Sequence, residues 1–111
     1  MIKKKEHAIY RAAHHTYGIS TQVTVALEEL AELQQEVCKM IRGRGERHHM
    51  AEEIADALIV IEQLMLISGI SYGEVQKVRV QKLVRLVKRM AKDTKKTEKE
   101  MWEWIKTLEN T

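Results

Sequence analysis

Not one proline occurs in the 111 residues of this chain. Proline ends or kinks a helix because it lacks a backbone N–H, so its absence leaves long helices uninterrupted. The composition is rich in Ala, Leu, Glu, Lys, Gln and Met, which all favour helices. The length suits one domain, and 44% hydrophobic residues suffice for a core. We therefore expect a single all-α domain over residues 1–111.

Apolar residues recur at helical spacing in four segments, which turn signals separate. The segments cover residues 3–16, about 22–42, about 49–67 and about 72–91. Consecutive amphipathic helices of this length predict a four-helix-bundle-type fold. In the fourth segment, the residues expected to face the core are Val75, Val78, Leu83, Leu86, Val87 and Met90.

Capping residues mark the ends of these helices. Gly18 is suited to end the first helix, and Ser20 or Thr21 to cap the second. Thr97 and Glu100 form an S/T-x-x-E capping box, which predicts an extra C-terminal helix over about residues 97–109. On that helix, the side chains expected to dock on the bundle or on a neighbouring subunit are Trp102, Ile105 and Leu108.

The third helix is unusual because apolar side chains occupy nearly every direction around it between residues 55 and 67. A helix that is apolar all round is normally buried on all sides. A bundle of 111 residues is too small to surround one of its own helices completely. We therefore expect this helix to contact another subunit, in a homodimer or homotetramer.

Cysteine content and hydropathy narrow the class of protein further. A single Cys38 excludes an intramolecular disulfide framework and a multi-cysteine zinc site. The longest uninterrupted apolar run, residues 57–61, is five residues, far below the ~18 that span a bilayer. The basic N-terminus is followed by no apolar stretch of the kind found in signal peptides. These features predict a cytoplasmic protein with no membrane partner.

Charge is distributed unevenly along the chain, although the formal net charge is only +3. Residues 48–76 contain five acids and no Lys or Arg, whereas residues 77–96 contain nine Lys or Arg and one acid. Such segregation is typical of solvated helix faces or of segments that bind ligands of opposite sign. The acidic and basic residues in these segments distinguish a solvated face from a ligand site by their spacing.

The acids of the second and third segments form a candidate metal site. Glu29, Glu32 and Glu36 fall along one stripe of a helix, and Glu53 and Asp56 share a face of the next. Carboxylates that meet at the edge of an apolar core repel one another unless a cation lies between them. Carboxylate oxygens suit Mg²⁺, with Mn²⁺ as a substitute, rather than zinc. Solvation is the simpler interpretation for Glu28 and Glu52.

The acids have the order E-E-x-x-E … E-x-x-D, formed by Glu28, Glu29 and Glu32 and then by Glu53 and Asp56. This order resembles that of the MazG-like, all-α nucleoside triphosphate pyrophosphatase superfamily, over about residues 15–90. The resemblance implies hydrolysis of a (d)NTP to a (d)NMP and diphosphate, a reaction that cleans the nucleotide pool. It implies that all five acids are catalytic, with Glu28 orienting water and the other four holding Mg²⁺.

The resemblance also implies a set of side chains that bind the substrate. Cationic and amide groups of the fourth helix would contact the phosphates, and Lys39 would reach them from the second helix. The fourth helix departs from some relatives because Arg79 and Gln81 stand where those carry an acid and an asparagine. Base contacts are expected from Gln22 and its neighbours His14, His15 and Tyr17. The fourth-helix candidates are Lys77, Gln81, Lys82 and Arg85.

Three other interpretations compete with this one. The basic fourth helix could bind nucleic acid, but its cations share the helix with an apolar seam and no stacking aromatics accompany them there. The fold could also serve as a non-catalytic interaction module, which the complete set of acids disfavours. Glu46-x-x-His49 has the spacing of a di-iron carboxylate motif, but such a centre needs the motif twice. Nucleic acid is therefore not the expected partner.

Overall fold

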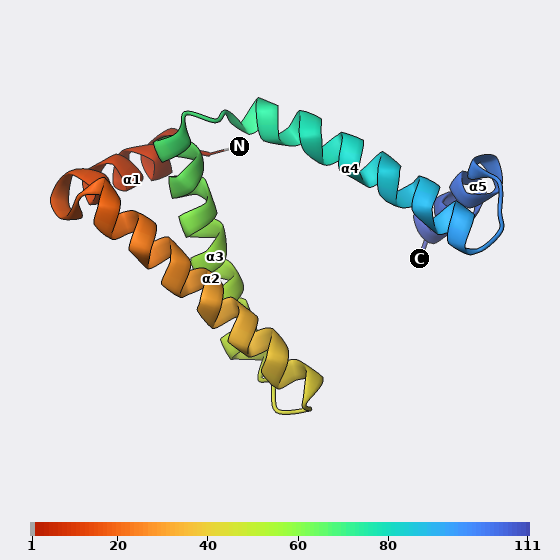
Figure 1. Ribbon diagram of the computed structural model, residues 1–111, viewed down its shortest axis with the longest axis horizontal. Coiled ribbons are helices and arrows are strands. Elements are labelled where there is room, and N and C mark those ends of the chain that lie inside the picture. The colour runs from red at the N-terminus through yellow and green to blue at the C-terminus, as the bar shows by residue number, and fades with distance from the viewer. Residues whose placement is uncertain (1) are drawn as a thin grey trace. The chain divides into compact units, whose positions relative to one another are not determined.

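The computed structural model describes residues 2–111 and is helical nearly throughout (Figure 1). The residues described contain no β-strand, so the predicted all-α class is confirmed. The chain forms two compact units, which meet in sequence at Tyr72 and Gly73. The helices are α1 (Lys4–Tyr17), α2 (Ile19–Ile41), α3 (Arg47–Ser68), α4 (Tyr72–Asp93) and α5 (Glu98–Leu108).

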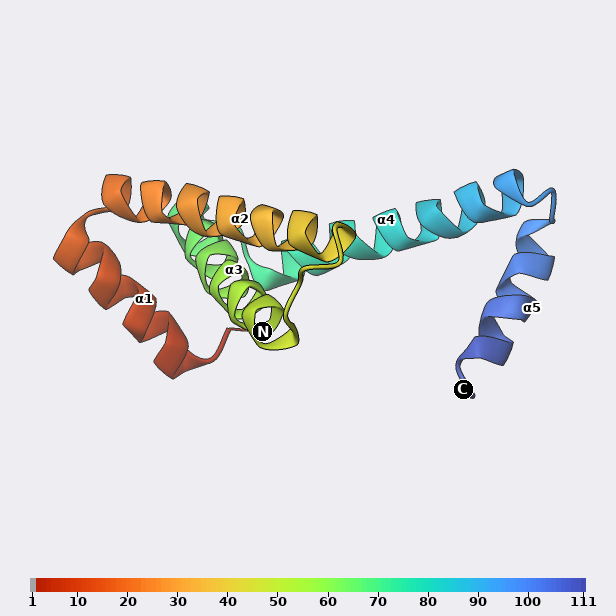
Figure 2. The same cartoon turned by 90° about the horizontal axis from the view of Figure 1, so that it is seen from below.

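The helix ends agree with the sequence expectations to within three residues, but α2 lacks the side-chain cap that was expected at its start. No side chain caps α2, and Ser20 and Thr21 lie inside the helix. Gly18 ends α1, as predicted, and also begins α2, with φ at 88° and its N–H donated to the carbonyl of His14 at 3.0 Å. Glycine adopts this positive φ without steric cost. The chain therefore reverses at one residue, as Figure 2 shows between α1 and α2.

In the first unit, α2 and α3 form a hairpin, and α1 packs against α2 (Figure 1). Ala26 on α2 and Ala57 and Val60 on α3 are buried, and these small side chains allow the two helices to approach closely. Tyr10 ties α1 to α3, because its hydroxyl donates to Glu62 Oε1 at 2.5 Å. Burial, this hydrogen bond and the charge of Glu62 raise the pKa of the Tyr10 hydroxyl, so the tyrosine stays a donor.

In the second unit, the end of α4 packs on α5. Val87, Ala91 and Met101 form its buried core, with Ile105 packed against it. Ile105 packs on the end of α4, whereas Trp102 and Leu108 are exposed on the second unit, so their docking on another surface stays a prediction. The reason for this exposure is helical phase: α5 buries the face of Met101 and Ile105, which are one turn apart.

The predicted capping box at the start of α5 is confirmed. The backbone N–H of Glu100 donates to Thr97 Oγ1 at 3.1 Å, and the N–H of Thr97 donates to Glu100 Oε1 at 3.1 Å. These two bonds, the nearby charge of Lys96 contributing less, lower the pKa of Glu100. The backbone N–H groups of Thr97 and Glu100 at the start of α5 are thus paired with side chains three residues away.

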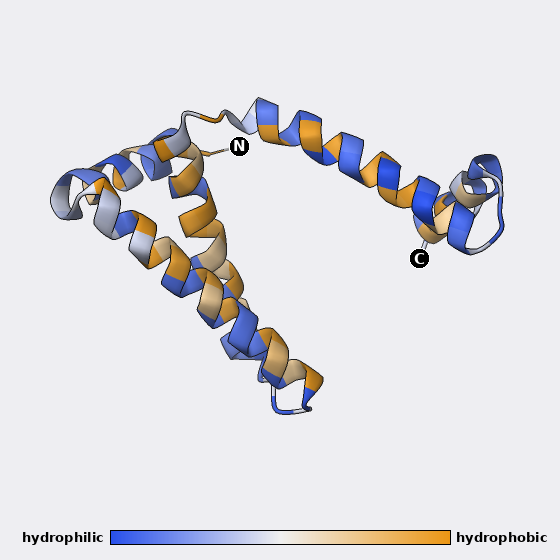
Figure 3. Ribbon diagram, viewed as in Figure 1, coloured by the Kyte–Doolittle hydropathy of each residue, from blue (hydrophilic) through white to orange (hydrophobic). Residues whose placement is uncertain are grey.

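Many large apolar side chains are exposed on both units, and Figure 3 shows hydrophobic residues recurring along α2, α3 and α4. Of the α4 residues expected to face the core, Val87 is buried and Met90 is partly buried. Within the second unit nothing covers Val75, Val78, Leu83 and Leu86, because α5 packs only on the last turns of α4, so the burial expected for these four stays a prediction. No single helix in residues 2–111 is both long and apolar enough to cross a membrane.

Candidate metal centre

Polar residues repeat every seven positions along the facing sides of α2 and α3. Seven residues are about two helical turns, so each series stays on one face of its helix. The two helices form a hairpin, so the two series run in opposite directions and their register aligns three pairs, which we call the polar layers: Gln22 with Gln63, Glu29 with Asp56, and Glu36 with His49. The structure shows the middle pair, Glu29 and Asp56, close together.

The middle layer is a cluster of three carboxylates. Glu29, Glu53 and Asp56 each offer one carboxylate oxygen, and these oxygens all lie within 4.8 Å of one another. The structure therefore brings together three of the four residues that were expected to hold a metal. Glu32 lies outside this group of three, but its charge acts on both Glu29 and Glu53.

Burial and mutual repulsion raise the pKa of two members of the cluster. Burial contributes most at Glu29, followed by the charges of Glu32 and Asp56, a hydrogen bond with Glu32 and the charge of Glu53. At Glu53 burial is again the largest cause, followed by Glu32 and Asp56, and Glu36 adds to them. Crowded carboxylates of this kind are stabilised either by a proton or by a cation.

Two oxygens of the cluster have no partner of their own. Glu29 Oε2 and Glu53 Oε2 are buried and accept no hydrogen bond from the protein. An unpaired buried carboxylate oxygen is costly, and divalent cations of the Mg²⁺ type take their ligands from such oxygens. The residues present therefore fit a hard divalent cation.

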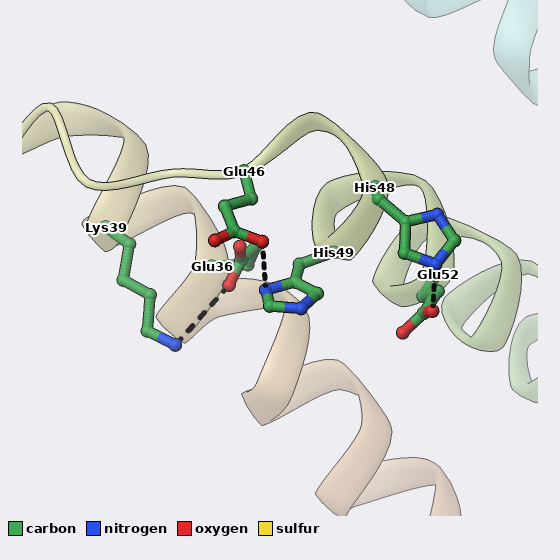
Figure 4. A network of polar contacts seen from close by, with 6 residues as sticks. All are labelled: Glu36, Lys39, Glu46, His48, His49 and Glu52. Atoms are coloured by element: carbon green, nitrogen blue, oxygen red, sulfur yellow. Dashed lines mark ion pairs between the residues drawn. The ribbon is translucent and has the colours of Figure 1, made fainter.

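On α2, Glu36 lies about two turns beyond Glu29, and Lys39 lies almost one turn beyond Glu36 (Figure 4). Lys39 Nζ is 3.6 Å from Glu36 Oε2, so the lysine that was expected to bind phosphate is paired with a carboxylate here. The Glu36 side chain is 5% exposed, and its Oε1 is buried without a partner. The sequence placed Glu36 on the acidic stripe but gave it no role. Its spacing of seven from Glu29 was the available signal.

The histidines at the start of α3 pair with nearby acids (Figure 4). His49 Nδ1 lies 3.4 Å from Glu46 Oε2, and His48 Nε2 lies 2.7 Å from Glu52 Oε1. Glu46 and His49, the two residues of the Glu46-x-x-His49 motif, thus pair with each other. Glu52 is exposed, which agrees with its interpretation as a solvated acid.

The remaining candidates are distributed over both units. Glu28 is exposed on α2, outside the three-carboxylate group. Gln22 is buried in the first polar layer at 8% exposure. Gln63, across that layer, was missed by the sequence analysis although it is equally buried and its Oε1 has no partner. The fourth-helix candidates are all exposed on α4, and their approach to the acids stays a prediction: Lys77, Gln81, Lys82 and Arg85.

Comparisons with protein-family models, with curated proteins and with solved structures each found no match. The chemistry of the site must therefore be argued from its own residues.

Proposed function

We propose that this chain is a Mg²⁺-dependent nucleoside triphosphate pyrophosphohydrolase, which converts a (d)NTP and water to a (d)NMP and diphosphate. The observation that carries the proposal is the group Glu29, Glu53 and Asp56, with ligand atoms within 4.8 Å and two buried oxygens lacking partners. The resemblance of the acid order to the MazG-like superfamily supports the same activity. Mn²⁺ has similar ligand preferences and would substitute for Mg²⁺.

In this proposal Glu29, Glu53 and Asp56 hold the cation, with Glu32 beside them. A bound divalent cation neutralises phosphate charge and positions the scissile group. Two carboxylates outside the group of three, Glu28 and Glu32, remain to orient the attacking water and accept its proton. The hydrolysed bond is the phosphoanhydride between the α and β phosphates.

Cationic side chains complete the proposed site by binding the triphosphate. Lys39 contacts Glu36, and its side chain is half exposed, so it could exchange this contact for one with a phosphate. The basic stretch of α4 contributes the remaining charge, through Lys77, Lys82 and Arg85. Amide groups of Gln22 and Gln81 supply hydrogen bonds to the substrate.

We also propose that the working form is a homodimer or homotetramer. Large apolar side chains on α2 and α3 are exposed in the single chain, among them Leu27 at 66%, Leu58 at 57% and Ile59 at 44%. Burying apolar surface contributes roughly 25 cal/mol per Å². A second copy would cover this surface, and sedimentation would show a mass of two or four chains.

The direct test is an assay for diphosphate with each common NTP and dNTP in the presence of Mg²⁺ or Mn²⁺. We expect turnover of at least one nucleotide, and its loss in Glu53→Gln and Asp56→Asn. Glu52→Gln is the matched control, because it removes the same charge one residue away at an exposed position and should retain activity. Absence of turnover with every nucleotide would refute the proposal.

A second candidate function is nucleic-acid binding through α4. The observation that favours it is the exposure of the cationic residues of that helix, seven Lys or Arg within residues 77–92, which Lys95 and Lys96 follow in the next turn. Salt-sensitive DNA binding combined with no nucleotide turnover would favour this candidate over the hydrolase.

A further inference from the structure

The end of α4 and its connection to α5 form a strongly basic stretch of the second unit. Between residues 88 and 99, six of the twelve residues are Lys or Arg and two are acids. All of these charged side chains are exposed. A cluster of this density attracts a partner that carries repeated negative charge. The six cations, called here the basic turn, are Lys88, Arg89, Lys92, Lys95, Lys96 and Lys99.

Lys95 holds a backbone conformation that glycine would adopt more easily. Its φ is 57°, and within residues 2–111 no other residue except glycine has a positive φ. The N–H of Lys96 donates to the Ala91 carbonyl at 2.8 Å, and the N–H of Lys95 donates to the Lys92 carbonyl at 3.2 Å. This pair of bonds ends a helix in the Schellman arrangement, which usually places glycine at the position of Lys95. The turn therefore keeps a cation where glycine would be the more stable choice.

Packing of α5 on the end of α4 brings an aromatic side chain to the basic turn, where the chain bends into α5 (Figure 2). Lys96 Nζ lies 5.0 Å from the centroid of the Trp104 ring, and Trp104 is 46% exposed. The lack of stacking aromatics among the cations of α4 argued against nucleic acid in the sequence. The fold supplies the missing aromatic from the next helix, so this argument no longer holds for the end of α4.

An exposed indole beside a cation is suited to a stacked base and its phosphate. Stacking on an aromatic side chain accepts every base, because each base has a π face, while lysines pair with the phosphates. In a duplex the base faces are covered by neighbouring base pairs, so a single strand is the form that stacks on a side chain. A lipid surface would match the cations, but Trp102 and Trp104 lie roughly 200° apart around α5 and cannot enter one surface together.

We propose that the second unit binds single-stranded nucleic acid, with Trp104 stacked on a base and the basic turn paired with the neighbouring phosphates. Lys96, which already lies over the indole, pairs with the phosphate of the stacked nucleotide. This site uses none of the acids of the first unit and does not depend on the proposed hydrolase. It also differs from binding by α4 alone, because it requires a residue of α5.

Tryptophan fluorescence tests the stacking directly, by titration with an oligonucleotide of about 12 thymidines in EDTA. Trp102→Phe leaves Trp104 as the single tryptophan, and the oligonucleotide should quench its emission. Trp104→Phe leaves Trp102, whose emission should not change. No binding by the unmodified protein, or quenching of Trp102 instead of Trp104, would overturn the inference.

Affinities of matched variants test the same contacts. Trp104→Ala should weaken binding roughly tenfold, whereas Trp102→Ala, which removes an indole of similar exposure at 47%, should bind as the unmodified protein does. Lys96→Met should also weaken binding, and Lys106→Met, at an exposed position on another face of α5, should not. Equal affinities within either pair would overturn the inference. Because Lys96 lies outside the core of Val87, Ala91 and Met101, its variant keeps the test decisive if Trp104→Ala fails to fold by circular dichroism.

Salt and competing partners test the identity of the ligand. With two or three phosphates contacted, affinity should fall roughly tenfold between about 50 and 200 mM salt. A DNA hairpin of the same length should bind more weakly, because its bases are not free to stack. Equal affinity for the hairpin would overturn the inference. Binding to vesicles of phosphatidylcholine and phosphatidylglycerol without binding to the oligonucleotide would also overturn it.

Discussion

The two units of this protein are built from helix pairs with opposite chemistry. Where α4 meets α5, Val87, Ala91 and Met101 are packed together and the capping box satisfies the helix start. Where α2 meets α3, buried oxygens of Glu29, Glu36 and Glu53 have no partner. The first arrangement serves stability, whereas the second lowers the stability of the isolated chain. Structures keep unfavourable contacts of this kind where a ligand relieves them.

The largest effect is expected from the apolar pair. Met101 is 1% exposed, so Met101→Ala should lower the free energy of unfolding of the second unit by about 2–5 kcal/mol. Both tryptophans, Trp102 and Trp104, lie on α5, so their fluorescence during urea unfolding reports on this unit. Leu108→Ala, at an exposed position, is the control and should cost far less. Equal losses would show that Met101 is not the centre of this core.

The polar pair should respond most to a cation. At a Mg²⁺ concentration near 100 times its Kd, binding should stabilise the first unit by about 2.7 kcal/mol. Thermal unfolding followed by circular dichroism should therefore shift upward with Mg²⁺. In Glu53→Gln the shift should disappear, while the metal-free protein should melt at a higher temperature because one repelling charge is gone. A lower metal-free melting temperature would argue that Glu53 is a structural residue.

A smaller effect is expected at the start of α5. Thr97→Ala removes the acceptor for the Glu100 N–H and should cost about 1 kcal/mol. Thr107→Ala, near the other end of the same helix, removes a hydroxyl that bonds only locally to the Trp104 carbonyl. Thr107→Ala should lower the free energy of unfolding less than Thr97→Ala does, as measured by the same tryptophan fluorescence. A larger loss in Thr107→Ala would contradict the role of the capping box.

The smallest effect, the dependence on pH, should have opposite signs in the two units. The pKa values of Glu29 and Glu53 are raised on folding, so the stability that their protonation provides is lost as pH rises through those values. The pKa of Glu100 is lowered, so its contribution is lost as pH falls through that value. The melting temperature of the metal-free first unit should therefore fall as pH rises above the ordinary pKa range of a glutamate.

The matching control for pH is Glu53→Gln, in which this weakening should be reduced. Tryptophan fluorescence should show the second unit losing stability at acid pH instead, and Glu100→Gln should diminish that loss. Parallel pH profiles for the two units would mean that the local environments of these acids do not govern stability.

The features that the sequence predicted well are governed by neighbours along the chain. Helix ends, the Thr97–Glu100 box and the proximity of Glu29 to Asp56 follow from helical spacing and from pairing of consecutive helices. The features it predicted poorly depend on partners distant in sequence. Which face of α4 is covered depends on what packs there, and periodicity alone could not show that α5 would reach only the end of α4 and leave Leu83 and Leu86 uncovered within the second unit.

Within the candidate site, some features could likewise be predicted from the sequence and others depend on how the helices pack. Residue type and spacing identified the acids, but the missing partners of Glu36 and Gln63 became visible only when α3 was placed against α2. The local rule held at Gly18, which ends α1 as predicted, but the predicted cap of α2 by Ser20 or Thr21 was wrong, since both lie inside the helix. The approach of Lys77 and Arg85 to the acids stays a prediction, because it depends on contacts beyond each helix.

The seven-residue spacing of the polar layers has a consequence for how this chain tolerates insertions and deletions. Adding one residue inside α2 between Gln22 and Glu36 would rotate everything beyond it by about 100°. The α2 residues of some layers would then no longer lie on the face that packs against α3. Residues 42–46, which connect α2 to α3, set no such phase and can change in length without disturbing the layers. Length variation among natural variants of this chain should therefore concentrate in that connection and be excluded from residues 22–36 and 49–63.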